Sequence, residues 1–216
     1  MDVSTAIRIR RSVRYFHDQE IPEETLRAVV RDAQSTPSWA NSQPWTAYVA
    51  TGDILARIKQ EHLTASRAGM RGGAEFQTVG RQSWSPETRQ NMAQWWEDLH
   101  DHLGPRDSVE YGDSQAELFN AAAIVYLTIP RNSTLWSVLD LGAFMQTLML
   151  SAVGHGLQTM SAYETVKFPQ IVRPHMGIPE SETLAIGVAL GYADERTINR
   201  FVPDRVPLES ILTIKK

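Results

Sequence analysis

The segment AAIVYLTI, residues 122–129, carries the strongest fold signal in this chain of 216 residues. It is a continuous apolar run rich in β-branched and aromatic side chains, which is typical of a strand buried on both faces. A second apolar run follows at residues 135–153 and is long enough for a helix. Because Asp140 and Gln146 interrupt it and it is short for a bilayer span, we expect a core helix rather than a membrane helix.

Further elements surround this strand and helix. The clearest is a helix at residues 22–34, which opens with Pro and Glu and carries an apolar stripe at helical spacing. Polar turns are expected at 104–115. Other expected elements are strands at 45–51 and 184–192, a strand or loop at 157–163, and helices after Asp53, after Ser85 and within 168–179. Because helices and strands are mixed without strict alternation, we expect an α+β fold with a mixed central sheet flanked by helices.

Composition restricts the function. Hydrophobic residues make up 42% and charged residues 21% of the chain, and the formal net charge is -4. These values suit a single globular domain and argue against a nucleic-acid partner. The absence of cysteine excludes disulfides, Cys-ligated metals and a thiol nucleophile, and the six histidines form no metal-ligand pattern. We therefore expect a cytoplasmic protein without a metal or a membrane span, whose reactivity as an enzyme would come from a cofactor.

Three separated stretches give a more specific indication. The first is RRSVR at 10–14, part of a segment, 8–14, that places four arginines in seven positions. Taken alone, this cluster could be a solvated basic face. The second is PSWANSQPW at 37–45, and the third is NRFVPDR at 199–205. In their order and spacing, and over nearly the whole chain, these stretches resemble the FMN-dependent nitroreductase family.

This resemblance implies a nitroreductase-like fold and an intertwined homodimer with FMN at the interface. Residues 1–216 would form one FMN-binding domain, with a variable lid at 68–118 and an extended tail at 193–216 that packs on the partner subunit. NADH or NADPH would pass hydride to flavin N5 in a ping-pong reaction, and a small nitroaromatic or quinone-like acceptor would receive it. Flavin N5 would be the reactive centre, so no catalytic side chain is expected.

The resemblance also implies which residues bind the cofactor phosphate. Arg10, with Arg11 or Ser12, and Arg205 would hold it, because guanidinium groups pair well with phosphate oxygens. Arg14 would face the ribityl chain or the pyrimidine edge of the ring. A cation at that edge stabilises the reduced, anionic flavin and so raises its reduction potential.

A second set of residues would border the flavin ring. It comprises Pro37, Ser38, Trp39 and Asn41 from the partner subunit, and the backbone of Ser161, Ala162, Tyr163 and Glu164 as donors to N5 and O4. Among these, Trp39 stands where the family often has a small residue. It could line the substrate cavity or pack at the dimer interface.

Other assignments have alternatives. Arg11 could form a surface ion pair. Asp140 and Gln146, on the apolar helix, could contact the partner or the flavin. Three lid residues could line the cavity or cover the core as one face of an amphipathic helix: Trp95, Trp96 and His100.

Two other functions also fit the sequence. One is a flavoenzyme of the same fold with different chemistry, such as reductive dehalogenation or dehydrogenation. Dehalogenating members grip a zwitterionic substrate with charged and tyrosine lid residues, and Glu110 and Tyr111 lie in the corresponding region. The other is a flavin-binding sensory protein without catalysis.

Overall fold

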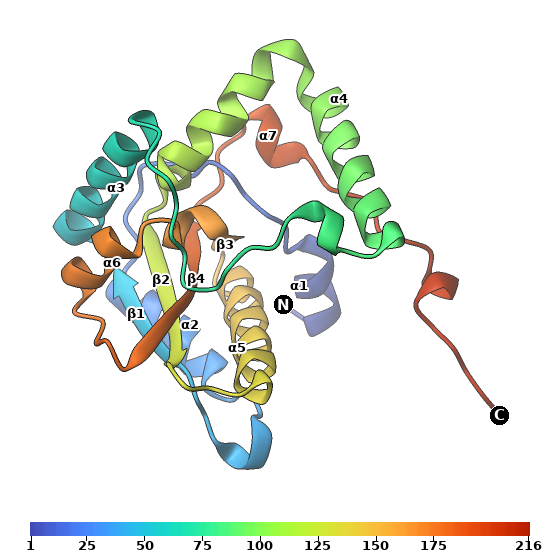
Figure 1. Cartoon of the computed structure of the whole chain (residues 1–216), viewed down its shortest axis with the longest axis horizontal. Coiled ribbons are helices and arrows are strands. Elements are labelled where there is room, and N and C mark those ends of the chain that lie inside the picture. The colour runs from blue at the N-terminus through green and yellow to red at the C-terminus, as the bar shows by residue number, and fades with distance from the viewer.

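The computed structural model describes residues 1–216, except for the side chains of residues 105–108. Its centre is a four-stranded sheet in the order β1-β2-β4-β3 (Figure 1). The strands are β1 (Thr46–Ala50), β2 (Ala123–Pro130), β3 (Gln158–Ala162) and β4 (Glu182–Gly191). The segment at 122–129 is therefore a central strand, as predicted, and the expected α+β class is confirmed.

The pairing within the sheet is more uniform than the mixed sheet expected from the sequence. All three strand pairs are antiparallel. A parallel contact occurs at the outer edge of β3, where Ser12 forms an isolated bridge with Thr159. The direction of each strand depends on connections that run through long helices, and such connections allow a chain to return in either direction.

Both faces of β2 are buried, and its side chains alternate between two apolar clusters. Ile124 and Tyr126 pack into one cluster, while Val125 and Leu127 pack into the other. The second cluster is covered by α2 (Glu23–Ala33) and α5 (Leu135–Gly154), and the first by α3 (Gly52–Arg67) and α6 (Pro169–Met176). This two-sided burial explains why β2 is an uninterrupted apolar run.

Helix α5 is the described helix that is long and apolar enough to cross a membrane by length and composition alone. Its buried side chains include Phe144, Leu148 and Ala152, which belong to the cluster beneath the sheet. Core packing accounts for the apolar residues on this face, whereas Leu135, Trp136 and Leu139 of the same helix are exposed.

Helix α4 extends from Pro86 to Ala116, so the polar turns expected at 104–115 are wrong. Ser85 caps its first turn by accepting a hydrogen bond from the Thr88 backbone at 3.2 Å. The helix bends sharply at Gly104, where φ is 69° and ψ is -179°, and then continues. Figure 1 shows the two arms meeting at this bend. Of residues 109–116 in the second arm, three are exposed and Ser114 is buried. The Glu, Asp, Ser, Gln and Gly content of this arm resembles that of a loop.

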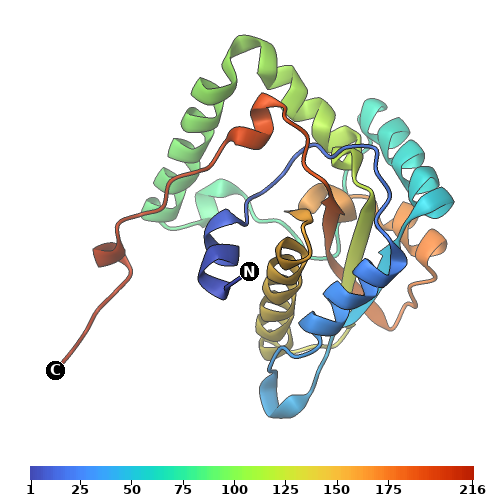
Figure 2. The same cartoon turned by 180° about the vertical axis from the view of Figure 1, so that it is seen from behind.

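The two ends of the chain lie on one side of the sheet. Helix α1 (Val3–Ile9) is followed by an extended segment that passes β3, and α7 (Thr197–Arg200) packs near α4. Beyond α7 the tail runs away from the body of the molecule (Figures 1 and 2). The tail forms a short 3₁₀ turn at Leu208–Ser210, and its ILTI end, residues 211–214, forms no strand within one chain.

Candidate cofactor site

The basic segment at 10–14 lies directly beside the end of β3. The Val13 backbone donates a hydrogen bond of 3.0 Å to the carbonyl of Thr159, next to the Ser12–Thr159 bridge. Two residues further along β3 comes Ser161, the first of the predicted ring-facing positions. The fold therefore brings together two of the predicted parts of the site, although about 150 residues separate them in sequence.

Asn199 fixes this segment from the other side. Its side-chain oxygen accepts hydrogen bonds from the backbone N–H groups of Arg14 at 2.7 Å and Tyr15 at 3.1 Å. Its nitrogen donates to the Tyr15 carbonyl at 2.7 Å, and to the backbone carbonyl and the Oδ1 atom of Asp194 at 3.1 and 2.9 Å. Only 1% of Asn199 is exposed. Asn199 belongs to the NRFVPDR stretch, and its position between apolar Ile198 and Phe201 is the signal in the sequence of a buried amide.

Positive groups gather at the outer end of this segment. The pKa of Arg10 lies below its usual value, first because the side chain is partly buried and second because the Arg205 charge is nearby. Arg205 uses its guanidinium only on the carbonyls of Pro203 and Asp204, at 2.8 and 3.0 Å. Like charges held close together are stabilised by an anion placed between them.

The guanidinium group of Arg11 also has a donor that an anion could bind. Its Nε atom is buried and has no hydrogen-bond partner. The alternative of a surface ion pair is not realised, because no described carboxylate lies within 4.0 Å of Arg10, Arg11, Arg14 or Arg205. Unpartnered guanidinium donors in this arrangement fit the phosphate of a mononucleotide.

Arg14 points inward from the segment and is 6% exposed. Its guanidinium lies over the rings of Trp95 and Tyr111, 5.9 and 5.7 Å from their centroids, and its Nε atom has no partner. Burial lowers the pKa of Arg14, and contact with Tyr111 partly offsets this effect. The site thus contains a buried cation that no described carboxylate neutralises, as expected of a residue facing a ligand that becomes anionic.

The end of β3 turns into a 3₁₀ helix at Tyr163–Val166. As first residues of this turn, Tyr163 and Glu164 find no acceptor for their backbone N–H groups within it. Although burial opposes ionisation of Glu164, its contacts with His62 and with Lys167, 3.1 Å away, keep its pKa below the usual range. The backbone N–H groups here can therefore donate hydrogen bonds to a ligand, while the Glu164 carboxylate is paired with Lys167.

The loop at 37–45 lies elsewhere in the same chain. The Trp39 backbone donates a hydrogen bond to Asp140 on α5 at 3.0 Å, and the Trp39 ring stacks on Trp136 with centroids 4.6 Å apart. Ser38 accepts from the Gln43 backbone at 2.9 Å. Within one chain, Asp140 thus anchors this loop, while Gln146 is exposed on α5.

This location separates the loop from the basic segment. Asp140 lies in the first half of α5. Strand β3 begins just after the other end of α5, and the basic segment lies beside β3 (Figure 1). From Asp140 to Gly154 the helical rise alone amounts to about 20 Å. One chain therefore does not bring Pro37, Ser38, Trp39 and Asn41 to its own basic segment, so a contribution of this loop to a cofactor site requires a second chain.

An apolar cavity of about 670 Å³ lies next to Tyr163. Its walls come from α5, from the segment before α4 and from α4 itself, and include Phe76, Trp84, Met92, Trp95 and Met145. Trp95 thus lines a cavity adjoining the predicted ring position. Trp96 and His100 border a different pocket, of about 80 Å³, which Leu99, Leu103 and Tyr111 of the same helix also line.

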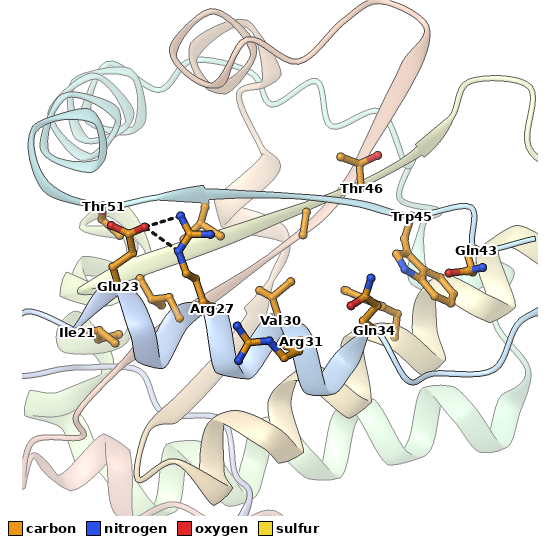
Figure 3. Close-up of a pocket in the computed structure, with 14 residues that line it drawn as sticks. Ile21, Glu23, Arg27, Val30, Arg31, Gln34, Gln43, Trp45, Thr46 and Thr51 are labelled. Carbon is orange, nitrogen blue, oxygen red and sulfur yellow. Dashed lines mark hydrogen bonds and ion pairs between the residues drawn. The ribbon is translucent and has the colours of Figure 1, made fainter.

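A larger groove, of about 790 Å³, lies far from the basic segment, between α2 and the unpaired edge of β1 (Figure 3). Figure 3 shows Val30 and Trp45 between the helix and the strand, and the Glu23–Arg27 pair at one end. Neither the arginine cluster nor the end of β3 contributes to its walls. This groove is therefore a candidate for a protein contact and not for the cofactor.

The described residues contain no group of three or more His, Asp or Glu side chains that could hold a metal ion. His62 is buried with its two ring nitrogens 3.0 Å from the carbonyls of Ala116 and Glu164. His175 lies 2.8 Å from Glu61 on the opposite side of the molecule from the arginine cluster. In both cases the histidine side chain is held by groups of the protein itself.

Comparison with known proteins gives a consistent result. A family model described as "Nitroreductase family" matches residues 7–192. A 4-nitrobenzoate reductase of a Nocardioides species is 32% identical over 87% of this chain and 79% of its own length. A chloronitrobenzene nitroreductase of Comamonas testosteroni is 29% identical over 98% and 96%. The crystal structure of the FMN-dependent nitroreductase NfnB of Mycobacterium smegmatis, in complex with NADPH, superposes with a TM-score of 0.90 at 27% identity over the full length of both chains.

Proposed function

Because the chain belongs to the nitroreductase family, we propose that it is an FMN-dependent NAD(P)H oxidoreductase that reduces nitroaromatic or quinone-like acceptors. The observation that carries this proposal is the set of four guanidinium groups without carboxylate partners beside the end of β3. Two curated relatives named as reductases of nitroaromatic compounds and a structural relative bound to NADPH support it.

Bound FMN supplies hydride transfer through its N5 atom, and the protein supplies binding and electrostatics. Arg10, Arg11 and Arg205 would hold the phosphate, with the Ser12 hydroxyl as a further donor. Arg14 would place its charge at the pyrimidine edge, where negative charge develops on reduction. The backbone at Ser161, Ala162 and Tyr163 would fix the other side of the ring.

The apolar cavity beside Tyr163 suits a flat aromatic acceptor. Apolar side chains dominate its walls, six of them aromatic or thioether, and Trp95 offers a ring face for stacking. Exclusion of water from such a cavity would protect the reduced flavin from side reactions before the acceptor binds. The nicotinamide of NADH or NADPH is flat as well and would occupy the same space before the acceptor, which fits a ping-pong reaction.

We propose a homodimer that completes each cofactor site with the partner's loop at 37–45. Exposed apolar side chains support this state on α5, at Leu135, Trp136 and Leu139, and along the tail. The partner's tail could bind in the groove of Figure 3, because the outer edge of β1 is unpaired there. The tail carries the exposed apolar side chains of Ile211, Leu212 and Ile214. The cysteine-free sequence is compatible with a cytoplasmic location.

The alternative of a dehalogenase is less well supported by the contacts in the lid. Glu110 lies 3.4 Å from Arg196, and Tyr111 packs against Arg14. These side chains are therefore engaged within the chain and are poorly placed to grip a zwitterionic substrate.

The test combines cofactor content with turnover. The purified protein should show a flavin spectrum and oxidise NADH or NADPH with 4-nitrobenzoate or a quinone. Arg10→Ala and Arg205→Ala should each weaken FMN binding at least about tenfold, since each removes a charge-assisted contact. Arg57→Ala, on the exposed side of α3, is the matched control and should bind FMN normally.

Two results would contradict this assignment. Normal FMN content in both Arg10→Ala and Arg205→Ala would remove the phosphate site. Bound FMN without turnover by either reductant would favour a sensory protein over an enzyme.

A further inference from the structure

The surroundings of Arg14 differ from those of a structural arginine. Its guanidinium is buried, its Nη1 atom makes one long hydrogen bond of 3.4 Å to the Ser12 carbonyl, and its Nε atom has no partner. The rings of Trp95 and Tyr111 lie within 6 Å of it. An aromatic face attracts a cation through its quadrupole but leaves the net charge in place.

Arg196, a short distance along the same wall, provides an internal comparison. It too lies over an aromatic ring, with its guanidinium carbon 3.6 Å from the centroid of Tyr15. Unlike Arg14, it also pairs with the carboxylates of Asp194 at 3.0 Å and Glu110 at 3.4 Å. Arg196 is therefore a neutralised, structural cation, whereas the aromatic contacts of Arg14 keep its charge available.

The two aromatic residues reach Arg14 because α4 is bent. Trp95 and Tyr111 are 16 residues apart, and on a straight helix this separation would be about 24 Å. Their ring centroids are instead 6.5 Å apart, one on each side of the bend at Gly104 (Figure 1). The backbone conformation of Gly104, with positive φ and extended ψ, is accessible almost exclusively to glycine. The bend thus closes the two arms of α4 around one side chain.

We propose that Trp95 and Tyr111 are positioning residues that hold Arg14 in place without neutralising it, so that its full charge raises the reduction potential of bound flavin. This inference rests on the proposed function. A carboxylate at either position would hold Arg14 equally well but would cancel the charge that the reduced flavin needs. Because Trp95 also lines the apolar cavity, the same indole contacts both the cation and the space for the acceptor.

The experiment is a spectroscopic measurement of the midpoint potential of FMN in the holoenzyme. Trp95→Leu and Tyr111→Glu should each shift the reduction equilibrium about tenfold toward oxidised flavin, which is about 30 mV for a two-electron couple. Tyr111→Phe keeps the ring and should retain the potential of the unmodified protein. Affinity for oxidised FMN, measured by titrating the apoprotein, should change less than affinity for reduced FMN, because the cation acts mainly on the anionic form.

Asn91→Ala is the matched control, since Asn91 is an exposed residue on α4, one turn before Trp95. An equal shift in Asn91→Ala would show that any change in α4 alters the potential and would overturn the inference. Unchanged potentials in Trp95→Leu and Tyr111→Glu would also overturn it. If Trp95→Leu does not fold, Tyr111→Glu against Tyr111→Phe decides the question. A protein that binds no FMN would instead refute the proposed function, so the two failures are distinguishable.

Discussion

The side chain of Asn199 accepts a hydrogen bond of 2.7 Å from the backbone N–H of Arg14, 185 residues earlier in the chain. The same amide pairs with both the N–H and the carbonyl of Tyr15, so it replaces a strand partner for the segment that carries the arginine cluster. The position of Arg14 is therefore fixed from the C-terminal part of the chain before any ligand binds.

Replacement of this amide should destabilise the fold. Asn199→Ala leaves two buried backbone N–H groups, those of Arg14 and Tyr15, without their acceptor and removes one of two donors to the Tyr15 carbonyl, so we expect a loss of about 2–4 kcal/mol in the free energy of unfolding. Denaturant unfolding monitored by circular dichroism measures this loss. Asn132→Ala, at an exposed position, should change stability by less than about 0.5 kcal/mol. Equal stability of the two variants would show that Asn199 does not fix the segment.

Asp140 should control the loop at 37–45. Asp140→Ala removes the acceptor of the Trp39 backbone, while Asp140→Asn keeps an oxygen at the same place. We expect the alanine variant to lower FMN retention on gel filtration and the asparagine variant to preserve most of it, because the loop would lose its anchor only in the first case. Comparable retention in both variants would mean that the loop is held by Trp39–Trp136 stacking alone.

The pH dependence of stability should reflect Glu75. Burial opposes its ionisation, but hydrogen bonds from Arg173 at 2.6 and 2.8 Å and from the Leu184 backbone at 2.9 Å outweigh burial and lower its pKa. With a folded-state pKa below the unfolded value of about 4.3, the ion pair stabilises the fold above that pH. The contribution is lost as the pH falls through the folded-state value.

Glu75→Gln should therefore cost about 3 kcal/mol at neutral pH, because it leaves the largely buried Arg173 without its counter-charge. As the pH falls below the folded-state pKa of Glu75, the variant and the unmodified protein should converge in stability. Urea unfolding at a series of pH values gives both quantities. Glu180→Gln, at an exposed carboxylate that pairs with Arg131, serves as the control and should leave the pH profile unchanged.

The tail should determine the oligomeric state. Ile211→Asp combined with Ile214→Asp places two charges on the surface proposed to fill the partner's groove. Since each buried aliphatic chain stabilises an interface by about 1.5–3 kcal/mol, the dimer should weaken at least a hundredfold. Sedimentation velocity measures this shift, with Lys216→Glu as a control of similar charge change. A dimer of unaltered stability would exclude the tail from the interface.

Much of the fold could be predicted from the sequence because its strongest elements have unambiguous patterns. The apolar run of β2 and the long apolar α5 were placed to within one or two residues. The second arm of α4 could not be predicted, since a helix made largely of polar residues and a polar loop have similar composition. The direction of the strands also depends on tertiary packing, which local patterns do not contain.

The candidate site was predictable to the extent that it consists of short motifs. The basic cluster and the end of β3 lie together, and Arg10 is near Arg205, as the resemblance implied. The roles of Asn199, Asp140 and Trp95 could not be predicted, because each depends on a partner more than 55 residues away. Each of them is a single residue outside any repeating pattern, so the sequence gives no information about its partner.

The separation of the loop at 37–45 from the arginine cluster has a genetic consequence for the proposed dimer. Consider a mixed pair in which one copy carries an inactivating change in the loop and the other carries one at Arg10. Both lesions then fall in the same cofactor site, and the second site is assembled entirely from unaltered parts. Co-expression of two dead alleles would restore function in the pairs that mix.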